Sequence, residues 1–132
     1  MFDLPAAIER FDPDIPIAQA WTPPASWYTA AEVFELERAT VFRRSWQHAT
    51  RLELLTAPGD FTSGCLLGEP WLCVRGHDRE LRAFYNTCRH KGREVVTGAG
   101  NGAQLVCGYH AWSYDLTGRL RSAPQVRGIE SF

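Results

Sequence analysis

Short apolar stretches separated by turn residues dominate the chain from residue 46 onward. Residues 71–75 and 81–85 have the length and the aromatic and β-branched content of strands, and the polar segment between them has the character of a hairpin loop. Clusters of Gly, Pro, Asn and Asp punctuate the remaining stretches. The pattern therefore predicts a mainly β domain, with strands at 64–67, 71–75, 81–85, 104–106, 112–114 and 119–121, and turns at 58–60, 69–70, 76–80, 98–102 and 115–118.

The first 25 residues have a different pattern, because five of the eight prolines lie within the first 24 positions. Such a segment cannot run as one helix, since each proline ring removes a donor and restricts the residue before it. We expect residues 1 to about 25 to form an extended arm. Apolar residues such as Phe11 and Trp21 favour an arm that docks on another surface, and a partly ordered tail is the alternative.

A helical pattern follows from residue 30 to about 42, with Val33 and Leu36 on one apolar face. Thr29 and Glu32 have the spacing of a capping box, which predicts where this helix begins. The helix is expected to pack on the domain rather than to bind a partner. The chain would thus comprise an N-terminal arm and helix at 1–45 and a β domain at 46–132.

Composition narrows the class of protein. The chain has 132 residues, 45% of them hydrophobic and 22% charged, with a net charge of −1, which is typical of a globular domain and gives no general attraction to nucleic acid or to a membrane. No secretory signal is visible at Met1, so a cytoplasmic location is the expectation. Four cysteines in such a chain suggest metal binding before disulfides.

Two Cys–His pairs carry the candidate chemistry: Cys88 with His90, and Cys107 with His110. Each pair lies on a predicted loop that leaves a strand, where a rigid sheet can aim the side chains at a common point. Two thiolates and two imidazoles are the ligand set of a Rieske [2Fe–2S] cluster. Structural zinc uses the same residue types, although zinc sites usually pair like ligands in sequence, and chance placement is the other alternative.

The other cysteines and histidines have simpler interpretations. Cys65 and Cys73 are expected to be buried strand residues, because free cysteine is commonly buried. His48 and His77 are expected to lie in a strand and a turn respectively, with structural roles only. No catalytic residue is predicted in this chain.

The segments 86–92 and 107–118, which contain the two pairs, resemble the Rieske domain of ring-hydroxylating oxygenase alpha subunits. This family of non-haem iron oxygenases includes aromatic dioxygenases and demethylating or quaternary-amine monooxygenases. The resemblance extends upstream through Trp46 and the segments 58–61, 75–76 and 81–86. It implies a Rieske-type iron–sulfur β-sandwich preceded by the arm and one α-helix, with Cys88 and Cys107 on one iron and His90 and His110 on the other.

The resemblance also implies a function: an oxidoreductase component that receives electrons from a ferredoxin or a flavin reductase and passes them to a mononuclear non-haem Fe(II). That iron needs two histidines and a carboxylate, and no histidine follows His110, so we expect it in a missing or partner catalytic domain. The complete protein would be a homotrimer. The present chain would lack its closing strands and would be inactive alone. A free-standing Rieske ferredoxin is the alternative, and a zinc-stabilised binding module a third.

One further expectation concerns the redox potential of the cluster. High-potential Rieske proteins carry a serine two residues after the second histidine, and this serine donates a hydrogen bond to a bridging sulfur. Trp112 stands at that position here. Losing a donor disfavours the reduced cluster, so a potential at the low end of the Rieske span is predicted.

Overall fold

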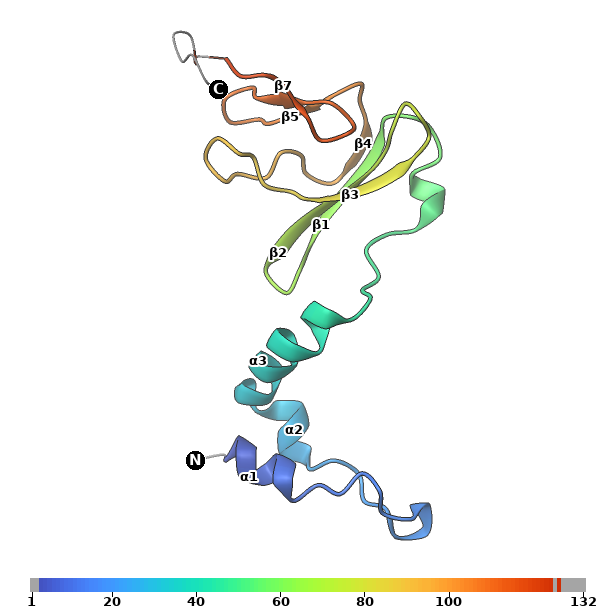
Figure 1. Cartoon of the computed structure of the whole chain (residues 1–132), viewed down its shortest axis with the longest axis vertical. Coiled ribbons are helices and arrows are strands. Elements are labelled where there is room, and N and C mark those ends of the chain that lie inside the picture. Colours follow the sequence, from blue (N-terminus) through green and yellow to red (C-terminus); the bar gives the residue numbers. More distant parts are fainter. Residues whose placement is uncertain (1–2, 125, 127–132) are drawn as a thin grey trace. The chain divides into compact units, whose positions relative to one another are not determined.

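A computed structural model of the chain describes residues 3–124 and 126. The chain divides into two compact units, residues 1–47 and 48–132, shown in Figure 1. Among the described residues, the first unit has helices but no strand, and the strands lie in the second unit. None of the helices in the described part of the chain is long and apolar enough to cross a bilayer.

The N-terminal segment is not fully extended, which corrects the prediction made from its prolines. A short helix, α1, spans Leu4–Glu9 and begins at Asp3, whose side chain accepts a hydrogen bond of 3.2 Å from the Ala6 N–H. Pro5 lies in the first turn, where a backbone N–H would have no acceptor within the helix, so the N–H that proline lacks is not missed. Two more helical pieces precede residue 30: a 3₁₀ turn at Ile17–Gln19 and α2 at Ala25–Thr29.

The predicted helix after residue 30 is present as α3, Ala31–Thr40, but the prediction that Thr29 and Glu32 form a capping box is wrong. The Thr29 hydroxyl donates to the Ala25 carbonyl (3.3 Å) and so serves α2, while Ala30 occupies the cap of α3 and makes no side-chain bond there. Of the predicted apolar face, Val33 is buried and Leu36 is 38% exposed. A 3₁₀ turn at Phe42–Arg44 follows the helix.

The second unit is mainly β, as predicted, and consists of two antiparallel sheets. The larger sheet has the strand order β3-β2-β1-β4 and the smaller has the order β5-β6-β7 (Figure 1). A 3₁₀ turn at Leu52–Leu54 precedes them. The strands are β1 Asp60–Leu66, β2 Glu69–Arg75, β3 Leu81–Tyr85, β4 Ala99–Asn101, β5 Leu105–Val106, β6 Ser113–Tyr114 and β7 Leu120–Ser122.

Several strand boundaries differ from the predicted ones. β1 begins at Asp60, within the predicted turn 58–60, rather than at residue 64, and the bounds of β5, β6 and β7 differ from the predicted ones by one residue. The turn between β1 and β2 consists of Leu67 and Gly68, both with positive φ, as a two-residue hairpin turn requires. Glu69 and Pro70, predicted as the turn, instead begin β2, where Pro70 lies opposite Cys65. The glycine-rich connection at 98–102 contains β4, which pairs with β1.

The buried core joins the two sheets and includes the predicted cysteine pair. Leu72 and Val74 of β2 pack with Leu105 of β5 and with Leu116, and Cys88 and Cys107 belong to the same cluster. Of the remaining cysteines, Cys73 is buried as expected, whereas Cys65 is exposed, which corrects that prediction.

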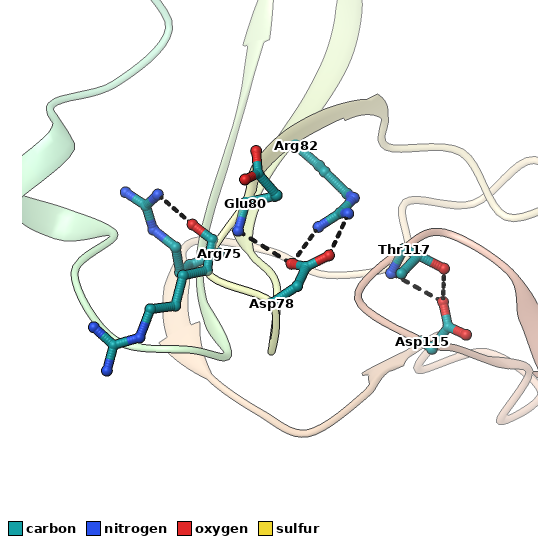
Figure 2. A network of polar contacts seen from close by, with 7 residues as sticks. Arg75, Asp78, Glu80, Arg82, Asp115 and Thr117 are labelled. Atoms are coloured by element: carbon teal, nitrogen blue, oxygen red, sulfur yellow. Dashed lines mark hydrogen bonds and ion pairs between the residues drawn. The ribbon is translucent and has the colours of Figure 1, made fainter.

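Figure 2 shows how the β2–β3 hairpin is closed at its turn. Asp78 accepts two hydrogen bonds from the Arg82 guanidinium (2.8 and 2.6 Å) and one from the Glu80 N–H (3.1 Å). These contacts lower the pKa of Asp78 to about 2, with the Arg82 hydrogen bonds as the largest cause. His77 lies in this turn, as predicted, while His48 lies outside any strand.

Candidate metal centre

The four predicted ligand residues lie on two loops of the second unit. Cys88 and His90 follow β3, and Cys107 and His110 lie between β5 and β6. Both cysteines are 2% exposed, and both imidazoles are partly exposed. Each loop therefore presents a buried thiol and a histidine nearer the surface.

In the first loop, two backbone hydrogen bonds meet at the cysteine. The Cys88 N–H donates to the Arg93 carbonyl (2.7 Å), and the Gly92 N–H donates to the Cys88 carbonyl (2.9 Å). Gly92 has a φ of 73°, which glycine adopts without strain. The loop is thus closed as a tight turn around the thiol.

The second loop repeats this pattern. The Cys107 N–H donates to the Trp112 carbonyl (2.9 Å), and the Ala111 N–H donates to the Cys107 carbonyl (3.0 Å). Ala111 stands at the position equivalent to the left-handed glycine of the first loop and also has a positive φ, 58°. The two loops share the same pattern of backbone hydrogen bonds, although their sequences are alike only in the Cys–His pairs.

The side chains meet as two like pairs. The rings of His90 and His110 are 4.6 Å apart between centroids, edge to face. Cys107 is close enough to Cys88 to be one of the groups that lower the pKa of its thiol. No three His, Cys, Asp or Glu side chains among the described residues gather as a single ion would require. The two thiols form one pair and the two imidazoles form the other, which is the ligand set of a two-iron cluster.

An aromatic ring lies against each imidazole. Trp112 stacks on His90 with centroids 4.7 Å apart and ring planes within 8°, and Tyr109 lies on His110 at 3.8 Å. Trp112 is buried and Tyr109 is 59% exposed. Each aromatic side chain limits the orientation of one histidine ring.

The His90 Nδ1 atom provides a test of whether the site fits a metal cluster. This atom is buried and has no hydrogen-bond partner in the described structure. Burial, then the nearby His110 and Lys91, lowers the pKa of His90 and favours the neutral ring that binds a metal. A buried nitrogen lone pair without a donor is what a ligand atom would present, so the residues fit the cluster.

Tyr114 is a residue of this site that the sequence did not single out for a role. Its Oη lies 3.3 Å from Cys88 Sγ and accepts a hydrogen bond of 3.0 Å from the Arg89 N–H. Burial, and next the contact with Cys88, raises the pKa of Tyr114 to about 12. The phenol therefore keeps its proton and can donate it toward the sulfur.

This contact also affects the thiol. Burial would raise the pKa of Cys88, but hydrogen bonds from Tyr114 and from the backbone N–H of His90, followed by smaller contributions, lower it overall. This contact could not be predicted from the sequence, because residues 88 and 114 lie 26 positions apart and meet only in the folded chain. The lowered pKa of Cys88 increases the fraction of thiolate, which is the form that binds iron.

Asn86 fixes the first loop to the sheet, and its side chain is fully buried. Its Nδ2 donates to the Val96 carbonyl (2.7 Å), and its Oδ1 accepts from the N–H groups of Val95 (2.9 Å) and Val96 (3.3 Å). The Asn86 side chain thus links the start of the Cys–His loop to residues 95 and 96, which follow the loop.

An open pocket of about 780 Å³ lies beside the site. Phe84 of β3, Leu105 of β5 and Tyr114 of β6 line it, together with Arg89 from the first loop. Its walls come from both sheets, so it opens directly onto the buried core.

Comparison with known proteins gives a consistent result. A family model described as the Rieske [2Fe-2S] domain matches residues 45–132. The chain is 38% identical over 122 residues to the carnitine monooxygenase oxygenase subunit of Acinetobacter baumannii, covering 92% of this chain and 32% of that protein. It is 34% identical over 130 residues to the chloroplastic choline monooxygenase of Arabidopsis thaliana, covering 98% of this chain and 31% of that protein.

A solved structure agrees with these relatives. The quaternary ammonium Rieske monooxygenase CntA superposes with a TM-score of 0.79 at 39% identity, over 86% of this chain and 32% of that one. The present chain thus spans about a third of the length of the relatives that it matches.

Proposed function

Since the chain belongs to the Rieske [2Fe–2S] domain family and is homologous to the N-terminal part of Rieske oxygenase alpha subunits, we propose that it is the electron-transfer portion of such an oxygenase. It would receive single electrons from a ferredoxin or flavin reductase. It would pass them to a mononuclear non-haem iron in a catalytic domain outside this chain. The observation that carries the proposal is the grouping of two thiols and two imidazoles on loops of matching backbone.

A Rieske domain implies a [2Fe–2S] cluster, and we propose that Cys88 and Cys107 hold one iron and His90 and His110 the other. The buried thiols and the unpartnered Nδ1 of His90 support this assignment. When bound, the cluster would supply one-electron chemistry. The chain's own part is to orient both imidazoles, through Trp112 and Tyr109, and to donate a hydrogen bond from Tyr114 to a cysteine sulfur.

The N-terminal unit favours the oxygenase over a free-standing ferredoxin. The matches to the carnitine and choline enzymes cover 92% and 98% of the chain, so they necessarily include most of residues 1–47. The arm and helices thus belong to what is shared with oxygenase subunits. Both relatives are named for quaternary ammonium substrates, and we propose a substrate of that class for the complete protein.

The first experiment is cofactor analysis of anaerobically purified protein. We expect two irons and two sulfides per chain, and a Rieske-type EPR signal on reduction. His90→Ala and His110→Ala should each abolish the signal. His77→Ala is the matched control, because His77 lies in the β2–β3 turn, and it should leave the signal intact. One equivalent of zinc without iron, in protein made with ample iron, would contradict the proposal.

A further inference from the structure

Gly118 lies in the turn between β6 and β7, against the side chain of Phe84 on β3. We propose that Gly118 is a positioning residue for the hydrogen bond between Tyr114 and Cys88, because its lack of a side chain lets the two sheets approach closely at this point. The inference rests on the proposed function, and it names a residue through which the chain would set the redox potential of the proposed cluster.

The hydrogen bond between Tyr114 and Cys88 depends on the spacing of the two sheets. Tyr114 belongs to β6 of the smaller sheet, and Cys88 follows β3 of the larger one. The Tyr114 Oη lies 3.3 Å from the Cys88 Sγ and accepts a hydrogen bond of 3.0 Å from the Arg89 N–H. Hydrogen bonds weaken as their atoms are drawn apart, so a wider spacing of the sheets would weaken both contacts.

The two sheets touch at Gly118. A Cβ added to Gly118 would lie 2.8 Å from the Phe84 Cε1 and 3.1 Å from the Phe84 Cζ, so one of the two sides would have to move. Phe84 lies four positions before Cys88, and Gly118 lies four positions after Tyr114. Phe84, Gly118 and Tyr114 also line the same pocket. The contact at Gly118 therefore lies close to the hydrogen bond that it would set.

Both sides of this contact are held in place. In the β6–β7 turn, the Asp115 Oδ1 accepts hydrogen bonds from the Thr117 N–H (2.9 Å) and the Thr117 hydroxyl (2.6 Å), as Figure 2 shows. Leu116 of the same turn is 2% exposed, and Phe84 packs against the buried core. A Cβ in this turn would therefore displace the turn as a unit, together with the end of β6, and not deform it locally.

The test measures the midpoint potential of the cluster-loaded chain by redox titration followed by EPR. Gly118→Ala should lower the potential, in the same direction as Tyr114→Phe, because a weaker hydrogen bond to the sulfur stabilises the reduced cluster less. At a fixed applied potential, we expect the ratio of reduced to oxidised cluster to fall about two- to fivefold. An unchanged potential in Gly118→Ala would overturn the proposal.

Gly68→Ala is the matched control. Gly68 lies in the β1–β2 turn with a φ of 86°, against 87° at Gly118, and a Cβ added to it would meet no atom within 4 Å. Both substitutions place alanine in the left-handed region, where it is strained, but only Gly118→Ala adds a close contact. Gly68→Ala should keep the wild-type potential. An equal fall in this variant would assign the effect to backbone strain alone and would overturn the proposal.

A double variant separates positioning from other effects on the cluster. In the Tyr114→Phe background there is no hydroxyl to displace, so adding Gly118→Ala should cause no further fall in the potential. The two single changes act on one hydrogen bond, and their effects should therefore not add. Additive falls would mean that Gly118 acts on the cluster by another route, and they would overturn the proposal.

Hydrogen exchange at the Arg89 amide gives a readout that needs no cluster. This N–H donates to the Tyr114 Oη, so displacement of Tyr114 should speed its exchange in Gly118→Ala but not in Gly68→Ala. If Gly118→Ala does not fold, Gly118→Asn takes its place with Gly68→Asn as its control, because asparagine tolerates a positive φ and brings the same Cβ. Unchanged exchange at Arg89 would overturn the proposal.

The proposed function and the positioning role fail in different ways. A chain without iron and sulfide would refute the proposed function, and exchange at Arg89 would still test the role of Gly118. A loaded chain whose potential and Arg89 exchange are the same in Gly118→Ala as in the wild type would refute only the positioning role.

Discussion

Single side chains outside the four predicted ligands shape the site. Tyr114 reaches Cys88 from the second sheet, Asn86 fixes the first loop, and Trp112 lies flat against His90. Trp112 was predicted to leave the cluster short of one hydrogen-bond donor, and Tyr114 supplies a donor to a cysteine sulfur instead. The expected low potential therefore stays a prediction, now with a defined contribution from Tyr114.

Removal of the Tyr114 hydroxyl should lower the midpoint potential of the cluster. The hydrogen bond to Cys88 Sγ stabilises the more negative, reduced state. If the hydrogen bond stabilises the reduced cluster by about 1 kcal/mol more than the oxidised one, Tyr114→Phe should lower the potential by about 40 mV for a one-electron couple. Redox titration followed by EPR would measure this shift.

Tyr109→Phe is the control for this measurement. It removes a phenolic hydroxyl that makes no hydrogen bond to a sulfur atom among the described residues, and it keeps the ring that lies on His110. Its potential should stay close to that of the wild type. An equal potential in Tyr114→Phe would mean that the contact with Cys88 does not tune the cluster.

Asn86→Leu should destabilise the chain, because it leaves the N–H groups of Val95 and Val96 and the Val96 carbonyl without their partner. Each buried unpaired group costs roughly 1–3 kcal/mol, so we expect a loss of about 2–4 kcal/mol in the free energy of unfolding. Anaerobic denaturant unfolding would measure it. Asn101→Leu, at an exposed asparagine, should cost less than about 1 kcal/mol, and equal losses would contradict the role given to Asn86.

At the scale of elements, hairpins were more predictable than helix ends. The strand Leu81–Tyr85 agrees with its predicted bounds, since its aromatic residues and the polar loop before it are local signals. The capping box failed because Thr29 was already bonded to the preceding helix, which the pattern around residue 30 does not reveal. β4 was missed because its three residues, Ala99, Gly100 and Asn101, have no strand pattern of their own, and the strand exists only through its pairing with β1.

The turn of the β2–β3 hairpin gives a prediction about pH. Asp78 has its pKa lowered from 3.8 to about 2 by Arg82 first and then by the Glu80 N–H. A depressed carboxyl pKa stabilises the fold above the unfolded value of 3.8, and this contribution is lost as the pH falls toward 2. Asp78 should thus remain ionised at pH 3.8, where an ordinary aspartate is half protonated.

Carboxyl ¹³C chemical shifts recorded between pH 6 and 3 would test this directly. The Asp78 signal should move little over the range, whereas Arg82→Gln should restore a midpoint nearer 3.8. A wild-type midpoint near 3.8 would show that the Asp78–Arg82 contact is not maintained in solution.

At the scale of the whole molecule, both sheets end in open edges within the described residues. β3 is an edge strand of the larger sheet, and its Tyr85 is 78% exposed. The pocket of about 780 Å³ opens beside it and exposes part of the core. An unpaired edge next to apolar surface favours association. The predicted absence of the closing strands would also favour association of chains. That absence stays a prediction.

Tyr85→Lys should therefore reduce self-association, because a lysine on an edge strand opposes pairing with another chain. Sedimentation equilibrium should show concentration-dependent association of the wild type and a shift toward monomer in the variant. Tyr28→Lys, at an exposed tyrosine of the helical unit, should behave as the wild type does. A wild-type chain that stays monomeric at all concentrations would contradict this prediction.

The matching backbone of the two ligand loops has a consequence for how the protein is made. The four backbone hydrogen bonds described for these loops all involve the peptide groups of Cys88 and Cys107 themselves. If these bonds form during folding, less ordering is left for cluster binding to impose. We therefore expect that the folded chain could accept a cluster after its synthesis.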